Sequence, residues 1–232
     1  FLVVIQLGAI LAVAVMYFQK LNPFSPSKSA RQKQATWALW IKIVIACIPA
    51  AVLGLLFDDW MEAHLYNAYV VAATLIIYGV LFIALENSSI TANPSITKVG
   101  HVSTKTALFI GLFQLLSLVP GTSRSGSTIL GAMVLGCSRG VAAEFSFFLG
   151  IPVMFGASFL KLVKFFVKGN VLTGPQIFYT ILGMAIAFGV SVYSIQFLMG
   201  YVRRHDFKFF GYYRIILGVV VLAYFGITAL AA

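Results

Sequence analysis

Long apolar runs separated by short polar loops are the feature that most limits how this sequence can fold. Hydrophobic residues make up 61% of the chain and charged residues only 9%, far outside the composition of soluble domains. A helix needs about 20 apolar residues to cross a bilayer, so 232 residues are enough for about six crossings. The runs are continuously apolar, whereas membrane barrel strands alternate between polar and apolar residues. The sequence therefore predicts a single all-α polytopic membrane domain.

Six transmembrane spans and one atypical segment are predicted along the domain 1–232. The atypical segment, 106–136, has a polar centre, and we expect it to enter and leave the membrane as a re-entrant helix-turn-helix hairpin. Three spans on each side suggest two units of opposite orientation, the inverted repeats of transporters. We therefore predict a first repeat, 1–87, that lacks its hairpin, and a second, 106–232, that contains one. The spans are predicted at 2–18, 37–57, 68–85, 141–159, 177–202 and 210–230.

Basic residues account for the formal net charge of +10, and they gather in a few loops. Positive charge at the ends of apolar spans follows the positive-inside rule, and anionic lipid headgroups are the partner that it implies. Nucleic acid is not indicated. The basic loop residues are Lys20, Lys28, Arg31, Lys33, Lys98, Lys105, Lys161, Lys164, Lys168, Arg203, Arg204 and Lys208.

Loop charge settles only part of the orientation. The basic loop after the first span is predicted to be cytoplasmic, and the acidic loop with Asp58, Asp59 and Glu62 external. Whether Lys161 or Arg204 lies on the cytoplasmic side depends on whether the atypical segment returns or crosses, and the charges do not decide between these alternatives.

The stretch PGTSRSGST, residues 120–128, is polar although apolar runs flank it on both sides. Pro120 ends a helix, and Gly121 and Gly126 permit a tight turn with close backbone approach. The stretch STILGAMVLG, residues 127–136, is expected to begin a helix whose first N–H groups face the turn, and Arg124 adds a guanidinium, which together make an anion site. Burying that guanidinium without an anion would cost about 2.5 to 3.5 kcal/mol. Hydroxyl donors come from Ser123, Ser125, Ser127 and Thr128.

Two other interpretations of this stretch compete with anion binding. A nucleotide-binding P-loop would need a lysine where the chain has Ser127, and a strand before the turn. The second alternative is structural: small residues let helices pack closely, while Arg124 snorkels or pairs with a carboxylate. The arginine at the centre of a proline-glycine turn favours anion binding.

PGTSRSGSTI, with GLFQLLSLV before it and GAMVLGCSRGVAAEFSFFLGIPVMFGA after it, resembles the second signature region of the bacterial undecaprenyl-diphosphate phosphatases, the UppP or BacA family. VVIQLGAILAVAV and YYRIILGVVV are similar to the same family, so the resemblance covers almost the whole chain. It implies hydrolysis of a C55 lipid carrier diphosphate in the bacterial plasma membrane, recycling of the carrier for peptidoglycan synthesis, and bacitracin resistance. It also implies two re-entrant hairpins meeting near the membrane midplane.

The resemblance implies roles for nine residues. Ser123, Arg124 and Thr128 are expected to be catalytic, with Arg124 as the phosphate clamp. An equally good interpretation is that Arg139 and Glu144 form a charge pair at the start of a helix at the membrane interface. The expected substrate contacts are Gly121, Ser125, Gly126, Ser127, Arg139 and Arg214.

A divalent metal ion, Mg²⁺ or Ca²⁺, is implied by the resemblance, but no metal ligand is identified in this chain. The family's first signature, two glutamates four apart before a proline-serine-threonine-glycine-histidine turn, has no counterpart here. The chain starts at Phe1 inside an apolar run, so we expect an N-terminal truncation. The scattered acidic residues are Asp58, Asp59, Glu62, Glu86, Glu144 and Asp206, mostly in predicted loops, and His64, His101 and His205 are expected to be solvated.

Three further expectations concern partners and alternatives. A lipid-phosphate transporter or flippase would use the same midplane anion site, and it is the alternative function. A homodimer is compatible with the resemblance. Cys47 and Cys137 lie in apolar surroundings, where a thiol packs as a small hydrophobe, so neither a disulfide nor a metal site is predicted there.

Overall fold

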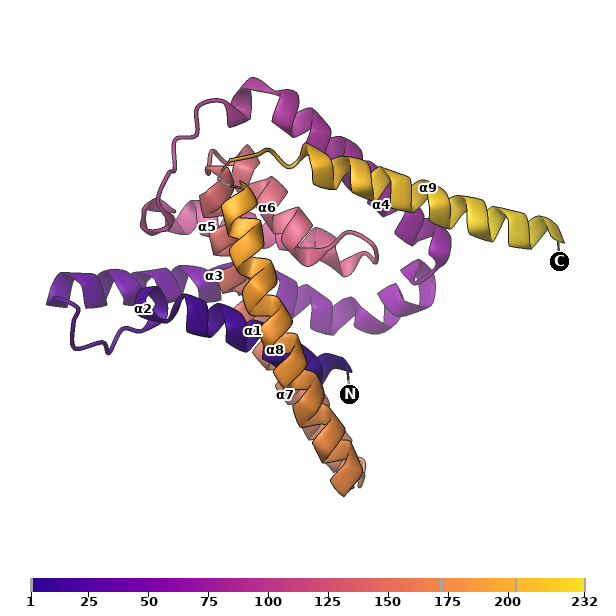
Figure 1. Cartoon of the computed structure of the whole chain (residues 1–232), viewed down its shortest axis with the longest axis horizontal. Coiled ribbons are helices and arrows are strands. Elements are labelled where there is room, and N and C mark those ends of the chain that lie inside the picture. The colour runs from indigo at the N-terminus through magenta and orange to yellow at the C-terminus, as the bar shows by residue number, and fades with distance from the viewer. Residues whose placement is uncertain (1, 172, 203, 232) are drawn as a thin grey trace. The chain divides into compact units, whose positions relative to one another are not determined.

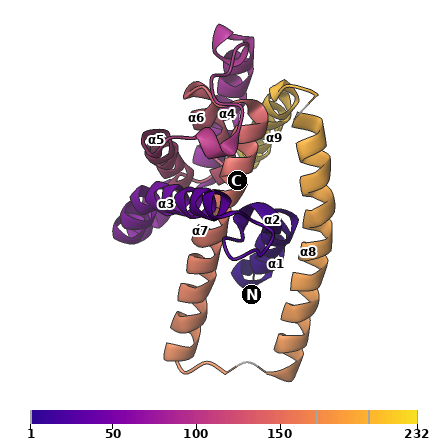
Figure 2. The same ribbon diagram turned by 90° about the vertical axis from the view of Figure 1, so that its left-hand side faces the viewer.

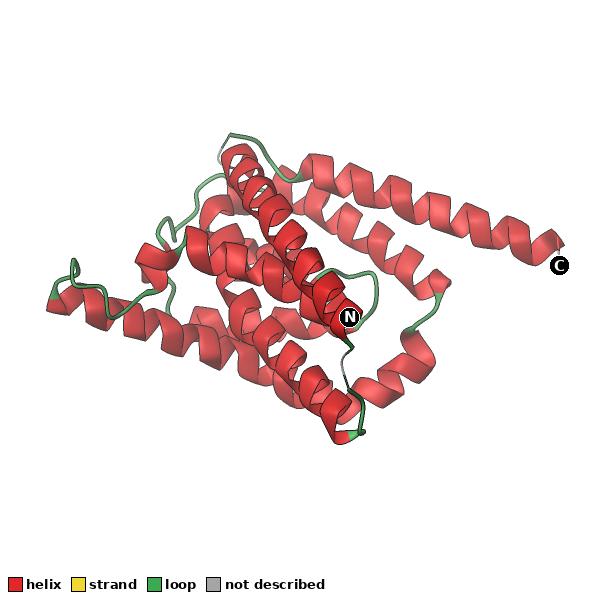
Figure 3. Ribbon diagram, turned by 60° about the horizontal axis from the view of Figure 1, so that its bottom comes forward, coloured by secondary structure: helices red, strands yellow, loops and turns green. Residues whose placement is uncertain are grey.

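The computed structural model describes residues 2–171, 173–202 and 204–231, and this part of the chain is helical without β-strands (Figures 1 and 3). Arg203, one of the predicted basic loop residues, lies outside the described residues. The α-helices are α1 (Leu2–Met16), α2 (Phe18–Leu21), α3 (Ala30–Leu65), α4 (Ala68–Asn87), α5 (Thr104–Leu115), α6 (Arg124–Val134), α7 (Arg139–Val167), α8 (Gly174–Val202) and α9 (Lys208–Ala231). Short 3₁₀ helices are η1 (Ser89–Thr91), η2 (Val99–His101) and η3 (Leu116–Leu118).

Five of the described helices are long and apolar enough to cross a membrane, which confirms the predicted all-α polytopic class. The sixth predicted span, 2–18, contains an apolar helix, α1, of 15 described residues, and its crossing of the membrane stays a prediction. The chain leaves the helix at Tyr17 before the short α2 begins. The candidate spans are Ala30–Phe57, Ala68–Asn87, Arg139–Val167, Gly174–Val202 and Lys208–Thr228.

Polar side chains at the ends of apolar runs determine where several helices begin. Asn67 accepts a hydrogen bond from the Val70 N–H at 2.9 Å and so caps α4. Ser103 caps α5 in the same way, at 3.0 Å from the Thr106 N–H. These caps satisfy N–H groups that have no partner within the first turn of a helix.

The predicted helix-turn-helix at 106–136 is confirmed as α5, η3, a turn and α6. The helices have 12 and 11 residues, so at 1.5 Å per residue each is about 16 to 18 Å long. Both are too short to cross a hydrocarbon core of about 30 Å, as a re-entrant hairpin requires. The two helices pack together where the Phe113 ring covers the bare backbone of Gly131.

The chain divides into two compact units. One contains Phe1–Val44 and Phe147–Tyr201, and the other contains Ile45–Ser146 and Val202–Ala232. In the first unit, Gly183 of α8 faces Ile5 of α1, and α8 runs back antiparallel to the second half of α7 (Figure 2). The second unit holds the hairpin together with α4 and α9. The inverted repeats 1–87 and 106–232 stay a prediction.

Within the second unit, α4 and α9 lie side by side with their backbones in close approach (Figure 1). A Cβ atom on Gly211 would lie 2.8 Å from the Gly79 carbonyl oxygen, and one on Gly218 would lie 2.9 Å from the Ala72 carbonyl oxygen. Small residues allow such contact between membrane helices. Because Arg214 lies three residues after Gly211 and four before Gly218, it shares the face of α9 that packs on α4.

Replacing Gly211 with alanine is expected to lower the apparent melting temperature by several degrees. The added methyl group would push the backbones of α4 and α9 apart, and overpacking of this kind costs about 1 to 3 kcal/mol. Gly226→Ala on the same helix is the matched control, because nothing lies within 4 Å of its added Cβ. Thermal unfolding in one detergent compares the two, and an equal loss in both would contradict the close approach at Gly211.

Candidate functional site

The turn between η3 and α6 has an unusual backbone. Gly121 has φ +85°, and Ser123 has φ +66°. Among the non-glycine residues that the structure describes, only Ser123 has a positive φ. Such a conformation costs a non-glycine residue about 1 to 3 kcal/mol and is found mostly at ligand sites. Ser123 caps α6, where its Oγ accepts a hydrogen bond from the Gly126 N–H at 3.3 Å. The turn is therefore held in a strained geometry at the start of a helix.

The four predicted hydroxyl residues separate into two pairs. Ser123 is exposed, and its Oγ lies 3.3 Å from the Oγ of half-buried Ser125. Ser127 and Thr128 are buried, and their hydroxyls donate to the Arg124 carbonyl oxygen at 2.9 and 3.0 Å. Thr128 also lies 2.7 Å from the Ser146 hydroxyl of α7. The structure therefore places Ser123 and Ser125 at the open start of the helix and directs the other pair into the protein.

Two arginines from different helices lie at this turn. Arg124 is the first residue of α6 and is half-buried. Arg214 of α9 donates from Nη2 to the carbonyl oxygens of Gly121, at 2.7 Å, and Thr122, at 3.0 Å. Its Nη1 lies 3.6 Å from the position that a Cβ on Gly126 would occupy. Although Arg214 is 90 residues away from Arg124 in the sequence, the fold brings both to the same site.

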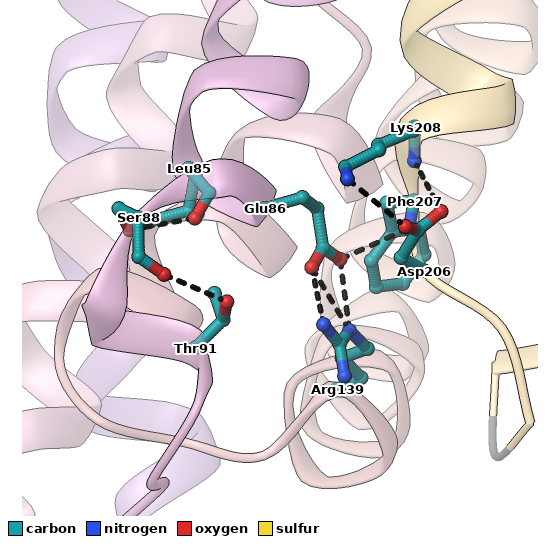
Figure 4. Close-up of polar contacts among 8 residues, drawn as sticks. All are labelled: Leu85, Glu86, Ser88, Thr91, Arg139, Asp206, Phe207 and Lys208. Atoms are coloured by element: carbon teal, nitrogen blue, oxygen red, sulfur yellow. Dashed lines mark hydrogen bonds and ion pairs between the residues drawn. The ribbon is translucent and has the colours of Figure 1, made fainter.

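Arg139 is engaged elsewhere in the unit, in an ion pair with Glu86 (Figure 4). Its Nε donates to Glu86 Oε1 at 2.9 Å and to Oε2 at 3.1 Å, and its Nη2 also contacts Oε2. Glu86 further accepts the Phe207 N–H at 2.9 Å. The sequence suggested Glu144 as the partner and a loop position for Glu86, but Glu86 lies buried in the last turn of α4. A substrate contact by Arg139 stays a prediction.

Arg139→Gln is expected to destabilise the protein more than Glu86→Gln. The Glu86 side chain is fully buried, whereas the Arg139 side chain is 33% exposed and can reach water once its partner is neutral. Removing one partner of a buried pair costs about 3 to 5 kcal/mol, which we expect for Arg139→Gln and a smaller loss for Glu86→Gln. Thermal unfolding of both variants tests the order. The double variant should recover part of the loss, and a reversed order would contradict this account of the pair.

Metal-binding side chains do not gather in the part of the chain that the structure describes. No three His, Cys, Asp or Glu residues come together there. Burial raises the pKa of the Cys137 thiol to about 11, so it stays protonated at neutral pH and is a poor metal ligand. The carboxylate of Glu86 is already occupied by Arg139. The described residues therefore hold no group of three such ligands for the divalent metal ion that the family resemblance implies, and that metal ion stays a prediction.

The comparisons with known proteins agree with one another, and the residues that they match include the whole site. The model of the family described as "Bacitracin resistance protein BacA" matches residues 1–220. This chain belongs to the BacA family. An undecaprenyl-diphosphatase of Streptococcus thermophilus is 58% identical to it over 97% of this chain and 78% of the relative. Proteins of the same name from Streptococcus mutans and Enterococcus faecalis are 57% and 54% identical, over 97% of this chain and 80% and 81% of the relatives.

Two residues around the site of this BacA family member were missed by sequence reasoning. Thr74 of α4 donates to the Pro120 carbonyl oxygen at 2.8 Å, and Ser146 of α7 contacts Thr128. Thr74 is the only polar residue other than tyrosine in the apolar run 68–85. This signal is weak, because a threonine hydroxyl in a helix can donate to a carbonyl group of its own helix. Ser146 offered no comparable signal.

Proposed function

We propose that this protein hydrolyses undecaprenyl diphosphate to undecaprenyl phosphate and inorganic phosphate in the bacterial plasma membrane. Membership of the BacA family and the high identity to relatives named undecaprenyl-diphosphatase support this function. The carrying observation is the turn at the start of α6, where the exposed Ser123, the half-buried Ser125, the first helix residue Arg124 and the guanidinium of Arg214 come together. Hydrolysis returns the lipid carrier to peptidoglycan synthesis, and bacitracin resistance follows from a larger supply of recycled carrier.

The substrate contacts that we propose are those at the open side of the turn. Arg124 is the phosphate clamp, because a planar guanidinium can hold two phosphate oxygens at once. The hydroxyls of Ser123 and Ser125 donate to the same group, and Gly126 leaves the helix start accessible to it. Arg214 adds a second positive charge beside the turn. A helix N-terminus favours an anion through its unpaired N–H groups and its dipole.

Ser127 and Thr128 have a different place in this proposal. Both hydroxyls are buried and bonded to the backbone of α6, and Thr128 also contacts Ser146. We therefore propose that they hold the helix start in position rather than contact the substrate.

Hydrolysis breaks the bond between the terminal phosphorus and the bridging oxygen, and water supplies the oxygen that replaces it. The leaving group is undecaprenyl phosphate. In phosphoryl transfer, catalysis consists mainly of positioning the phosphoryl group and stabilising charge on its oxygens. Arg124 and the Ser123 hydroxyl would position the phosphoryl group and stabilise the charge that develops on its oxygens. Mg²⁺ or Ca²⁺ is expected from the family, but no step of this proposal passes through a metal, since the described residues offer no group of ligands for it.

Membrane lipids are the partners implied by five apolar helices and the lipid substrate. A homodimer stays a prediction from the family resemblance. The transporter alternative is not favoured by the relatives' names.

Phosphate release from undecaprenyl diphosphate in detergent is the direct test. It is measured on this chain and on the extended protein, by which we mean this chain preceded by the family's first signature region. We expect release by the extended protein, where no vesicle or lipid reorientation is available. Lipid reorientation in vesicles without any phosphate release would instead support a transporter and contradict the proposed hydrolysis.

A further inference from the structure

Three successive carbonyl groups of the turn are held by side chains from two neighbouring helices. The Thr74 hydroxyl of α4 donates to the Pro120 carbonyl oxygen at 2.8 Å. Arg214 of α9 donates to the carbonyl oxygens of the next two residues, Gly121 and Thr122. The helices α4 and α9 pack directly on each other, so the two donors lie on one rigid pair.

The direction of these carbonyl groups also sets the direction of the N–H groups in the same peptide units. A planar trans peptide points its C=O and its N–H in opposite directions. Holding the Thr122 carbonyl toward Arg214 therefore turns the N–H of Ser123 away from α9. The positive φ of Ser123 then carries the chain into the first turn of α6, where Arg124 begins the helix.

The contact made by Thr74 is close as well as polar. Its hydroxyl lies within hydrogen-bond distance of the Val70 and Val71 carbonyl oxygens, at 3.0 and 2.9 Å, as threonine in a helix commonly does. The Pro120 carbonyl oxygen is nearer, at 2.8 Å. The hydroxyl also occupies the space where a Cβ on Gly121 would lie. Thr74 therefore fixes both the carbonyl direction and the distance of the turn from α4.

We propose that Thr74 is a positioning residue for the phosphate turn. With Arg214 it fixes the carbonyl groups of residues 120–122, and in this way it presents Ser123 and Arg124 to the terminal phosphate. This inference rests on the proposed function, because it assigns Thr74 to the same site. Thr74 acts through the backbone and does not touch the substrate. Small displacements matter here, since misplacing a reacting group by about 1 Å can cost 100-fold in rate.

Thr74→Val and Thr74→Ser separate the hydroxyl from the shape of the side chain. Valine keeps the shape and removes the donor, whereas serine keeps the donor. We expect kcat for phosphate release by the extended protein to fall about 10-fold in Thr74→Val, with KM changed less than about 3-fold. Thr74→Ser should keep at least half of the parent kcat. Thr228→Val is the matched control, because the Thr228 hydroxyl donates to carbonyl groups of its own helix, at 3.0 and 3.1 Å.

Hydrogen exchange of the segment 116–126 gives a second readout that does not need activity. Exchange should be faster in Thr74→Val than in the parent, and unchanged in Thr74→Ser and Thr228→Val. The proposal would be overturned by parent-like kcat and exchange in Thr74→Val, or by equal losses in the valine and serine variants. A parent that releases no phosphate, together with faster exchange in Thr74→Val, would reject the proposed function while supporting the positioning of the turn.

Discussion

Arg124→Ala is expected to reduce kcat for phosphate release by the extended protein by about 100- to 1,000-fold, the usual loss when one preorganised donor to a developing charge is removed. Arg124 begins α6 directly after the exposed Ser123, which is where the proposed anion site lies. The charge of a phosphoryl group spreads over several oxygens in the transition state. A fixed cation at that position stabilises the transition state more than the ground state.

Arg124→Lys distinguishes charge from geometry at the same position. Lysine keeps the positive charge but loses the planar fork of donors, so we expect an activity between those of the parent and Arg124→Ala. Arg31→Ala is the control, because Arg31 is an exposed cation in the first turn of α3. Initial rates at several substrate concentrations and melting temperatures are measured on the same preparations. Parent-like kcat/KM in Arg124→Ala would exclude a phosphate clamp at this residue.

The membrane fold could be predicted from the sequence because the length of an apolar run is a local property. The predicted spans 68–85 and 177–202 correspond to α4 and α8 within a few residues at either end. The end of α1 at Met16, inside the predicted span 2–18, could not be predicted, because apolar composition does not show where a helix stops. Nothing in the run before Tyr17 distinguishes the end of α1 from the middle of a span.

The site could be predicted only as far as its local motif. The turn follows from proline and glycine, and a helix follows it as expected, but α6 begins at Arg124 with Ser123 as its cap and not at Ser127. The four hydroxyl residues looked equivalent in sequence, but the helix directs Ser127 and Thr128 inward. Contacts across the fold, from Thr74 and Arg214, depend on how α4 and α9 pack. No spacing in the sequence encodes a partner 46 or 93 residues away.

Gly121→Ala is expected to be nearly as damaging as the loss of Arg124, for a reason that lies in the backbone. Gly121 has φ +85°, a conformation that costs an alanine about 1 to 2 kcal/mol. The added Cβ would also lie on the Thr74 hydroxyl and 2.7 Å from the Val71 carbonyl oxygen. The turn must then move away from α4, so we expect kcat to fall about 100-fold. Phosphate release and thermal unfolding are measured together, with Gly140→Ala as control.

The control and a double variant show how the prediction for Gly121 can fail. Nothing lies within 4 Å of a Cβ on Gly140, so Gly140→Ala should behave like the parent. Adding Thr74→Val to Gly121→Ala should cost little more activity, because the first change already separates the turn from α4 and residues in contact are not additive. Additive losses would mean that Thr74 and Gly121 act on the site separately. In that case the close approach of the turn to α4 would not be what places Arg124 at the phosphate.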